Sequence, residues 1–419
     1  MSRPFHFVPP SGRGQGQVAA GRCPTGVFLP RLFPMARFGL QLVLIPVALL
    51  LALGVTMLTS TSVFADDARL DVYVELRRHV VFLVIGLAAC AFAAVLDYRL
   101  WALWARPFYI GACLLLVLCF VPYFGAPANG AWRWIGLQSL GLPGLRLQPS
   151  EVARYAIIFG LAAWFARLHS REINFRTGVV VPVLIAGLPI GLQAIAPDVG
   201  GAALIGAVVL GLIFVAGLSW RWVTALSLTA AAALTTAVLM IPNRMARLVA
   251  FTDLEASRLE FGLQQWRGVL ALGSGGWQGM GLGSGRQKLF YMPFAHTDFV
   301  FPVVGEELGL VVTLLVVACF VAITVGGFML AMLAPDRFGR LIGCGIVMAL
   351  ALQAIINIGV TTATLPNKGL PLPFVSYGGS NLVMCLFGIG ILINLYRQGM
   401  ETGDRGLPLL DRPKRSPRA

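Results

Sequence analysis

Long apolar runs constrain this chain more than any other feature of its sequence. The hydrocarbon core of a bilayer is about 30 Å thick, and a helix needs about 20 apolar residues to cross it. Runs of this length occur near residues 39–59, 79–96, 107–124, 150–167, 177–196, 199–217, 221–240, 302–333, 338–361 and 374–396. Only helices and closed barrels satisfy their own backbone in lipid, and these runs lack the alternation of a barrel strand. We therefore expect an all-α integral membrane protein with about ten transmembrane helices.

Composition supports the same class and excludes others. Hydrophobic residues make up 58% of the 419 residues and charged residues 12%, whereas a soluble domain carries about 25% charge. The net charge of +14 fits a protein that borders an anionic lipid bilayer. No basic soluble domain with interleaved aromatic residues is present, so we expect no nucleic-acid partner. The seven cysteines lack metal-site spacing and are expected to be packing residues.

The distribution of charge predicts the topology. Most of the 32 Lys and Arg residues lie in the two termini and in the turns on one side of the apolar runs, and most of the 18 acidic residues lie on the other side. By the positive-inside rule, both termini are cytoplasmic. We expect a disordered cytoplasmic tail over residues 1–37, a membrane domain over 38–398 and a basic cytoplasmic tail over 399–419. Residues 242–301 then form one long extracytoplasmic loop between helices seven and eight.

Two outward-facing segments combine charged residues with signals for the start of a helix. The first holds Arg133 between two tryptophans and leads to Pro149-Ser150-Glu151. Headgroup anchoring and helix capping explain much of this segment, but they do not explain Arg133. The second holds Asp198 in a tight turn between two spans. Asp198 either caps the next helix or contacts a ligand, because an ionisable group at this depth is a functional candidate by default.

Two further outward-facing segments are rich in glycine or proline. Residues 273–285 are glycine-rich but lack the spacing of a nucleotide-binding loop, so we expect no nucleotide cofactor. Asp298 follows, and it either caps the span that starts near Pro302 or takes part in chemistry. Residues 365–380 contain prolines and glycines at membrane depth, where irregular backbone is tolerated if it lines a cavity. This segment is therefore predicted to be the wall of a pocket.

These segments carry a resemblance to a known family. The stretches NGAWRWI, QPSE, PDVGG, SGGWQGMGLG, QKLFYMPFAHTDFVFPVVGEELG and KGLPLPFVSYGGS occur in this order. Together they resemble the SEDS family, the FtsW, RodA and SpoVE group of cell-wall proteins, over roughly residues 40–398. The resemblance implies ten helices and a peptidoglycan glycosyltransferase that polymerises lipid II in the cytoplasmic (inner) membrane. It also implies a partner transpeptidase of the class B penicillin-binding type.

Within that family the chain is more similar to the division branch than to the elongation branch. Gln287-Lys288-Leu289 and Lys368 before Gly369 carry this similarity. It implies a place at the division septum beside other divisome membrane proteins. One departure stands near the candidate base, because the family usually has Glu where this chain has Phe294.

The chemistry follows from the compartment. No nucleotide is supplied outside the membrane, so a transfer reaction there needs an activated donor such as a sugar on a lipid diphosphate. The acceptor hydroxyl needs a base, and one carboxylate suffices for a single inverting displacement. We expect Asp298 to be the base. The other candidate substrate-binding residues are Arg133, Glu151, Asp198, Arg286, Lys288, His296, Thr297, Lys368, Ser376 and Tyr377. A divalent cation, Mg²⁺ or Mn²⁺, is a candidate to share the diphosphate with the basic residues, and no metal ligands are assigned.

Three alternatives stay open at this point. A flippase that moves the same lipid precursor would also use a cavity and a buried Asp198. A flippase needs polar groups from the inner to the outer leaflet, whereas this chain concentrates them on the outer half, which favours the enzyme. An elongation-type polymerase is the second alternative. A non-catalytic scaffold for the division machinery is the third, and it does not explain Asp298.

Overall fold

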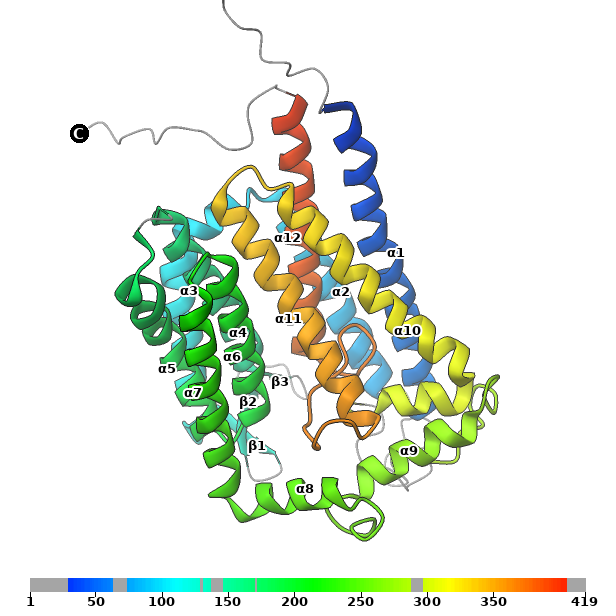
Figure 1. Cartoon of the computed structure of the whole chain (residues 1–419). Coiled ribbons are helices and arrows are strands. Elements are labelled where there is room, and N and C mark those ends of the chain that lie inside the picture. The colour runs from blue at the N-terminus through cyan, green and yellow to red at the C-terminus, as the bar shows by residue number, and fades with distance from the viewer. Residues whose placement is uncertain are drawn as a thin grey trace, which may run out of the picture.

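The computed structural model describes residues 29–62, 74–128, 131–136, 146–169, 172–287 and 297–404. Lys288, Phe294 and His296 lie outside these ranges, as do most of the two predicted tails. The described part is a bundle of long helices (Figure 1). Its helices are α1 (Leu29–Ser62), α2 (Val74–Val95), α3 (Arg99–Leu118), α4 (Pro149–Arg167), α5 (Val181–Ile195, after a π-helical turn at Arg176–Val180), α6 (Val199–Val215), α7 (Trp220–Leu239), α8 (Pro242–Thr252), α9 (Leu263–Gly275), α10 (Val300–Met332), α11 (Arg337–Thr361) and α12 (Gly379–Asp404).

The helical membrane fold predicted from the sequence is confirmed. Among the described residues, eight helices are long and apolar enough to cross a membrane, namely α1, α2, α3, α5 with its π-helical turn, α7, α10, α11 and α12. The helices α4 and α6 coincide with two further predicted spans, near 150–167 and 199–217. The exact count of ten stays a prediction. Helix α1 begins at Leu29 and α12 ends at Asp404, so both extend beyond the predicted borders of the membrane domain.

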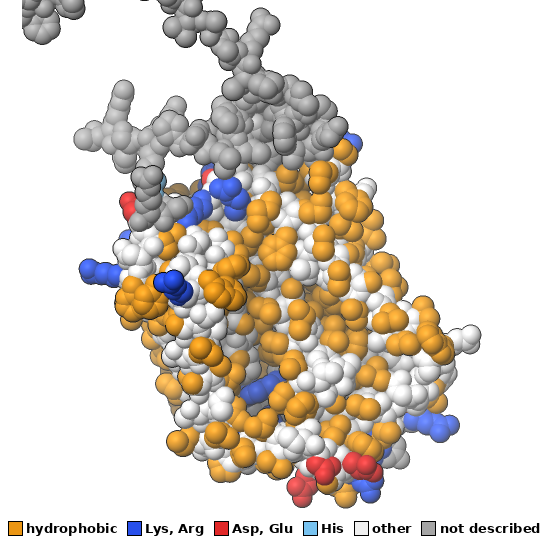
Figure 2. All heavy atoms as spheres, viewed as in Figure 1, with side chains coloured by type: hydrophobic (Ala, Val, Ile, Leu, Met, Phe, Trp, Pro, Cys, Tyr) orange, Lys and Arg blue, Asp and Glu red, His pale blue; other side chains and the backbone are white. Residues whose placement is uncertain are grey.

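Burial differs strongly between the helices. The helices α11 and α12 lie in the interior, with most of their spanning residues buried, whereas α7 is almost entirely exposed. Many large apolar side chains are exposed on the outer helices, such as Val84, Leu103, Leu184 and Leu228. Figure 2 shows apolar side chains over most of the middle of one face, with charged side chains toward its two ends and Lys or Arg side chains in a hollow between them. This pattern is expected of a surface that contacts lipid.

The predicted outer loop contains two helices, which the sequence reading did not anticipate. Helices α8 and α9 occupy much of residues 242–301. Figure 1 shows α8 lying across the end of the bundle that is opposite to the start of α1 and the end of α12. The glycine-rich segment after α9 is held against α10, where Gly309 has a φ of 79° and interrupts the helical backbone. The carboxylates of Glu306 and Glu307 accept hydrogen bonds from the backbone N–H groups of Arg286 and Gly283.

A small antiparallel sheet lies toward the same end of the bundle as α8 (Figure 1). It consists of β1 (Gly125–Ala128), β2 (Ala131–Gly136) and β3 (Arg146–Leu147), in the order β1-β2-β3. The register pairs Ala126 with Trp134 and Ile135 with Leu147. The all-α prediction did not include this sheet. It matters for the site because β2 carries Arg133.

Candidate active site

Four segments that are far apart in the sequence meet at the end of the bundle that carries α8. Asp298 lies just before α10, and Lys368-Gly369 lies between α11 and α12. The approach is close, since a Cβ placed on Gly369 would lie 2.5 Å from Oδ2 of Asp298. A Cβ placed on Gly200, at the start of α6, would lie 3.7 Å from Cδ of Lys368. Arg133 on β2 completes the group by donating a hydrogen bond to the Pro197 carbonyl oxygen at 2.5 Å.

Asp298 does not cap α10, and its carboxyl has a raised pKa. The N-cap residue of α10 is Phe299, and no side chain caps the helix there. Burial raises the pKa of Asp298 to about 6, Arg133 opposes this rise, and the negative charge of Asp198 adds to it. A carboxylate with a pKa near 6 is ionised at neutral pH and still accepts a proton more readily than an ordinary aspartate.

Several cations of the site lie close together, and each makes the protonated form of the others less favourable. Burial lowers the pKa of Lys368 to about 8, the charges of Arg244 and Arg247 lower it further, and Asp198 opposes them. Partial burial lowers the pKa of Arg247 as well, followed by the charges of Arg133 and Arg244. Cations that repel one another in this way are stabilised when an anion binds among them.

Arg244 and Arg247 were not among the residues predicted from the sequence. They lie one turn apart on α8, on the same side of the helix. The signal for them was present, because two arginines at this spacing occur in an amphipathic segment that directly follows a span. Arg244 also donates a hydrogen bond to the Ala237 carbonyl oxygen at the end of α7, at 3.1 Å.

Asp198 fits both interpretations considered from the sequence. It is the N-cap of α6 and accepts a hydrogen bond from the Gly201 N–H at 3.2 Å. It also influences the pKa of Asp298 and of Lys368, so its charge reaches the site. Beside it lies Gln193, which is buried and whose side-chain oxygen and nitrogen have no hydrogen-bond partner among the described residues. The sequence reading missed Gln193.

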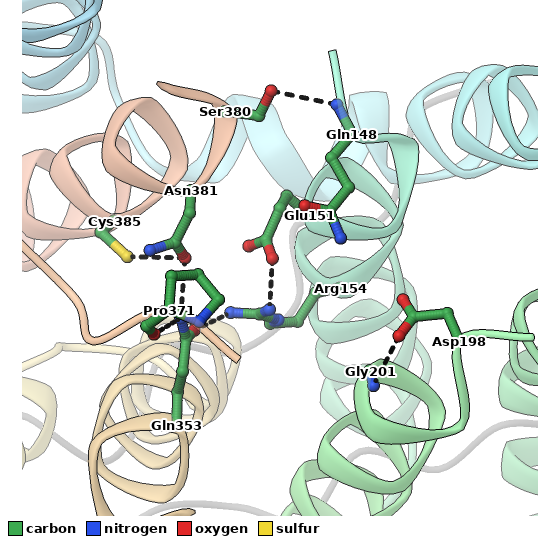
Figure 3. A network of polar contacts seen from close by, with 10 residues as sticks. All are labelled: Gln148, Glu151, Arg154, Asp198, Gly201, Gln353, Pro371, Ser380, Asn381 and Cys385. Atoms are coloured by element: carbon green, nitrogen blue, oxygen red, sulfur yellow. Dashed lines mark hydrogen bonds and ion pairs between the residues drawn. The ribbon is translucent and has the colours of Figure 1, made fainter. Parts of the chain in front are cut away.

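Glu151 belongs to a neighbouring polar network deeper in the bundle (Figure 3). Its carboxylate pairs with the Arg154 guanidinium at 2.9 Å, and both side chains are buried. Arg154 donates to Oε1 of Gln353, whose Nε2 donates to the Pro371 carbonyl oxygen at 2.7 Å and to Oδ1 of Asn381 at 2.9 Å. Glu151 therefore acts on the segment before α12 through other residues.

The remaining predicted residues are more dispersed. Ser376 is buried and accepts a hydrogen bond from the Leu372 N–H at 2.8 Å, which closes a turn in the segment between α11 and α12. The ring of Tyr377 lies against that of His79, with centroids 6.1 Å apart. Arg286 is exposed beside α10, and Thr297 is partly buried next to Asp298 in the chain. Lys288 and His296 fall outside the described residues.

The acidic residues at the site do not form a metal centre by themselves. Within the described ranges, no group of three or more His, Cys, Asp or Glu side chains is placed to hold a metal ion. Mg²⁺ is often held by one or two carboxylates together with phosphates of the substrate. Among the residues that the structure describes, the carboxylates of the site would therefore supply only part of the coordination of such an ion.

The chain is similar to known proteins over most of its length. Residues 40–401 match the model of the FtsW, RodA and SpoVE family, which is described as "Cell cycle protein". A protein of Geobacter metallireducens named probable peptidoglycan glycosyltransferase FtsW is 37% identical over 369 residues, 88% of this chain and 97% of that protein. A protein of Pseudomonas fluorescens with the same name is 37% identical over 351 residues, 83% of this chain and 85% of that protein.

Solved structures show the same fold. A chain in a structure of a peptidoglycan synthase complex, which coordinates polymerization and crosslinking, has a TM-score of 0.69 and 30% identity. The match covers 84% of this chain and 96% of that one. The crystal structure of the rod shape determining protein RodA of Thermus thermophilus has a TM-score of 0.62 and 29% identity, over 84% of this chain and 95% of that one.

Proposed function

The chain belongs to the FtsW, RodA and SpoVE family, and on that premise we propose that it is a peptidoglycan glycosyltransferase of the FtsW type. It polymerises lipid II into glycan strands during cell division. The observation that carries this proposal is the contact between the Asp298 carboxylate and the Lys368-Gly369 backbone, with Arg133 and Asp198 alongside. A base and a group of cations are the two features that glycosyl transfer from a lipid diphosphate requires.

Asp298 accepts the proton in the proposed reaction. The hydroxyl oxygen of the acceptor sugar attacks the anomeric carbon of the donor sugar and forms the new glycosidic bond. The bond from that carbon to the diphosphate oxygen breaks, and undecaprenyl diphosphate leaves with the electron pair. The hydroxyl proton passes to Asp298. One displacement inverts the anomeric centre and needs no second carboxylate as a nucleophile.

The cations hold the leaving group. The charges of Lys368, Arg133 and Arg247 act on one another, and that of Arg133 also acts on Asp298. A unit charge about 4 Å from a diphosphate oxygen gains about 4 kcal/mol before desolvation, at an effective dielectric near 20. The gain grows as the bond to the diphosphate breaks, because negative charge accumulates on the leaving oxygen. Arg286, Lys288, His296 and Thr297 stay predicted contacts with the substrate.

A divalent cation, if it takes part, would enter the site bound to the diphosphate of the substrate. The diphosphate itself would supply most of its oxygen ligands, because the described side chains do not form a metal site. Such an ion would supply positive charge to the leaving group. No step of the transfer is assigned to it.

The proposed site faces the outside of the cytoplasmic membrane, and both termini face the cytoplasm. The positions of α8, at one end of the bundle, and of the first and last described residues, at the other, support this orientation (Figure 1). The basic residues of the termini support it as well. The similarity to relatives named FtsW supports a septal location. We infer a class B penicillin-binding transpeptidase as partner, supported by the similar chain in a peptidoglycan synthase complex, together with other divisome membrane proteins.

The test of the function is the product made by the purified full-length chain with its partner transpeptidase. Labelled lipid II is added without any membrane gradient, and glycan polymers are separated by gel electrophoresis. We expect polymer from the wild-type chain. If no polymer forms while labelled lipid II crosses sealed vesicles that contain the chain, the protein is a flippase and the proposal is wrong.

A further inference from the structure

Asn357 connects the two segments that carry the proposed base and the proposed diphosphate ligand. It lies on α11 and is almost completely buried. Its Nδ2 donates one hydrogen bond to the carbonyl oxygen of Asp298 at 2.8 Å and another to the carbonyl oxygen of Leu370 at 2.6 Å. A single amide group therefore joins the backbone before α10 to the backbone that follows Lys368.

The orientation of this amide is fixed by its partners. Both partners are carbonyl oxygens and can only accept, so the nitrogen must point toward them and use both of its hydrogens. The Oδ1 atom is left buried without a hydrogen-bond partner among the described residues. A buried unsatisfied oxygen is unfavourable, and a leucine of similar size would avoid it. Packing alone therefore gives no reason for an asparagine at this position.

The preceding turn of α11 holds the same segment at a second point. Gln353 donates to the carbonyl oxygen of Pro371, next to the Leu370 carbonyl that Asn357 holds. The orientation of Gln353 is set by Arg154, which donates to its Oε1 atom. Two consecutive carbonyl groups are thus held by two turns of one buried helix, which fixes the segment along its own direction.

This arrangement sets the position of Lys368 relative to Asp298. Gly369 lies between Lys368 and the held carbonyl of Leu370, and it has no side chain to separate its backbone from the Asp298 carboxylate. The Asp298 backbone is held by the same amide of Asn357. If that amide is removed, the two segments lose their shared hydrogen-bond partner.

We propose that Asn357 is a positioning residue for the transfer reaction, which holds the Asp298 base and the Lys368 segment in a fixed relative position. The inference rests on the proposed function. Asn357 does not touch the substrate and acts only through the two backbone segments. Reacting groups must be held within a fraction of an ångström, and a misplacement of about 1 Å costs about 100-fold in rate.

The charges that face Asp298 come from other elements, which makes the test specific. Arg133 acts on it from β2 and Asp198 from the start of α6, while the segment before α12 approaches its carboxylate with the uncharged Gly369. The charged residues of α11 are Arg337 and Arg340, at the beginning of the helix and distant from Asn357 in the chain. A neutral substitution at Asn357 therefore changes geometry without changing any charge at the site.

The test compares Asn357→Leu with Thr361→Val in the full-length chain with its partner transpeptidase. Thr361 lies one turn further along α11 and is equally buried, and among the described residues its hydroxyl donates only within its own helix, to the carbonyls of Asn357 and Ile358. For Asn357→Leu we expect kcat for lipid II polymerisation to fall about 10- to 100-fold, with KM within about threefold. For Thr361→Val we expect kcat within about twofold of the wild type.

The pH dependence of kcat separates positioning from simple loss of folded protein. Release of the Asp298 segment lets water reach the carboxylate, so the acid limb of the profile should move to lower pH in Asn357→Leu. Loss of folded protein would lower the whole profile without moving that limb. If Asn357→Leu does not fold, Asn357→Thr, which keeps one donor, is measured in the same way and should show the same shift.

The proposal is overturned if both α11 variants lose activity equally, or if kcat falls only with the amount of folded protein and the acid limb stays in place. These outcomes differ from a failure of the proposed function. In that case the wild-type chain makes no glycan, or Asp298→Asn remains as active as the wild type.

Discussion

Two groups of charged side chains in this bundle differ in how their charges are balanced. In the buried network of Glu151, Arg154, Gln353 and Asn381, the carboxylate and the guanidinium pair with each other, and the Gln353 amide connects them to the backbone before α12 (Figure 3). In the outer cluster of Asp298, Lys368, Arg133 and Asp198, no hydrogen bond or ion pair reaches the Asp298 carboxylate or the Lys368 ammonium from the residues that the structure describes.

The difference indicates what each group is for. Charges in the buried network are neutralised inside the protein, so it stabilises one arrangement of α4, α11 and α12. The cations of the outer cluster outnumber its acids once Arg244 and Arg247 are included, and they lower the pKa of Lys368 together. Such a cluster reaches its most favourable state only when an anion binds. The two groups should therefore respond in opposite ways to substitution.

The largest effect is expected on stability, from the buried network. Glu151→Leu leaves the Arg154 guanidinium buried without its carboxylate, and breaking a buried pair in this way costs about 3–5 kcal/mol of unfolding free energy. Thermal unfolding of the purified chain in detergent measures the loss. The double variant Glu151→Leu/Arg154→Leu should recover most of the stability. A Glu151→Leu protein as stable as the wild type would remove the contrast between the two groups.

The next effect is expected on activity, from the outer cluster. Lys368→Ala removes a cation from the leaving group, so kcat/KM for lipid II should fall about 10- to 100-fold. Its thermal stability should stay the same or rise, because the lysine is partly buried near other cations. Arg258→Ala is the matched control, since Arg258 is an exposed cation on the segment between α8 and α9. Equal activity of the two variants would show that Lys368 is not a substrate contact.

A smaller effect on kcat is expected at Gly369, where the backbone approaches the Asp298 carboxylate. An added methyl group at Gly369 would lie 2.5 Å from Oδ2 of Asp298 and must displace it. We expect Gly369→Ala to lower kcat about tenfold. Gly378→Ala is the control, because its nearest neighbour would be the Asn381 Cβ at 3.6 Å, an ordinary contact. If both variants retain wild-type kcat, the base does not depend on this close approach.

The smallest effect is a pH dependence of the wild-type chain. Asp298 must be ionised to accept a proton, so kcat/KM should rise with pH through about 6, the pKa of that carboxyl. Lys368 must be protonated to hold the diphosphate, so kcat/KM should fall again through about 8. The profile is then bell-shaped, and Lys368→Ala should lose the alkaline limb. An alkaline limb that persists unchanged in Lys368→Ala would assign it to another group.

The sequence pointed to the charged residues of the outer cluster, but not to the buried residues that hold their backbone segments in place. Asp298, Lys368, Arg133 and Asp198 are charged residues where membrane packing does not need them, and this signal is local. Asn357 was missed, although Gln353, Asn357 and Thr361 recur every four residues on an apolar span and so share one face. That pattern shows a polar face but not its partners, which come from segments distant in the sequence.

The fold, too, was predicted from the sequence only in part. The apolar runs predicted the membrane helices, because length and apolarity alone decide whether a segment can cross a bilayer. The helices α8 and α9 and the strands β1 to β3 were missed, since they are short and their segments are polar or interrupted by glycine and proline. The position of Glu151 was also unexpected, because only tertiary structure shows its pairing with Arg154 in the interior.

The most direct measurement is lipid II polymerisation by the purified chain carrying Asp298→Asn, with its partner transpeptidase. Asparagine keeps the shape of the side chain but cannot take up the proton, so we expect the rate to fall about 100-fold or more while the protein remains folded and bound to its partner. Asp253→Asn is the control, because Asp253 is an exposed acid whose carboxylate accepts a hydrogen bond from the nearby Ala256 N–H. An Asp298→Asn protein that polymerises lipid II at the rate of the control would contradict the role of Asp298 as the base.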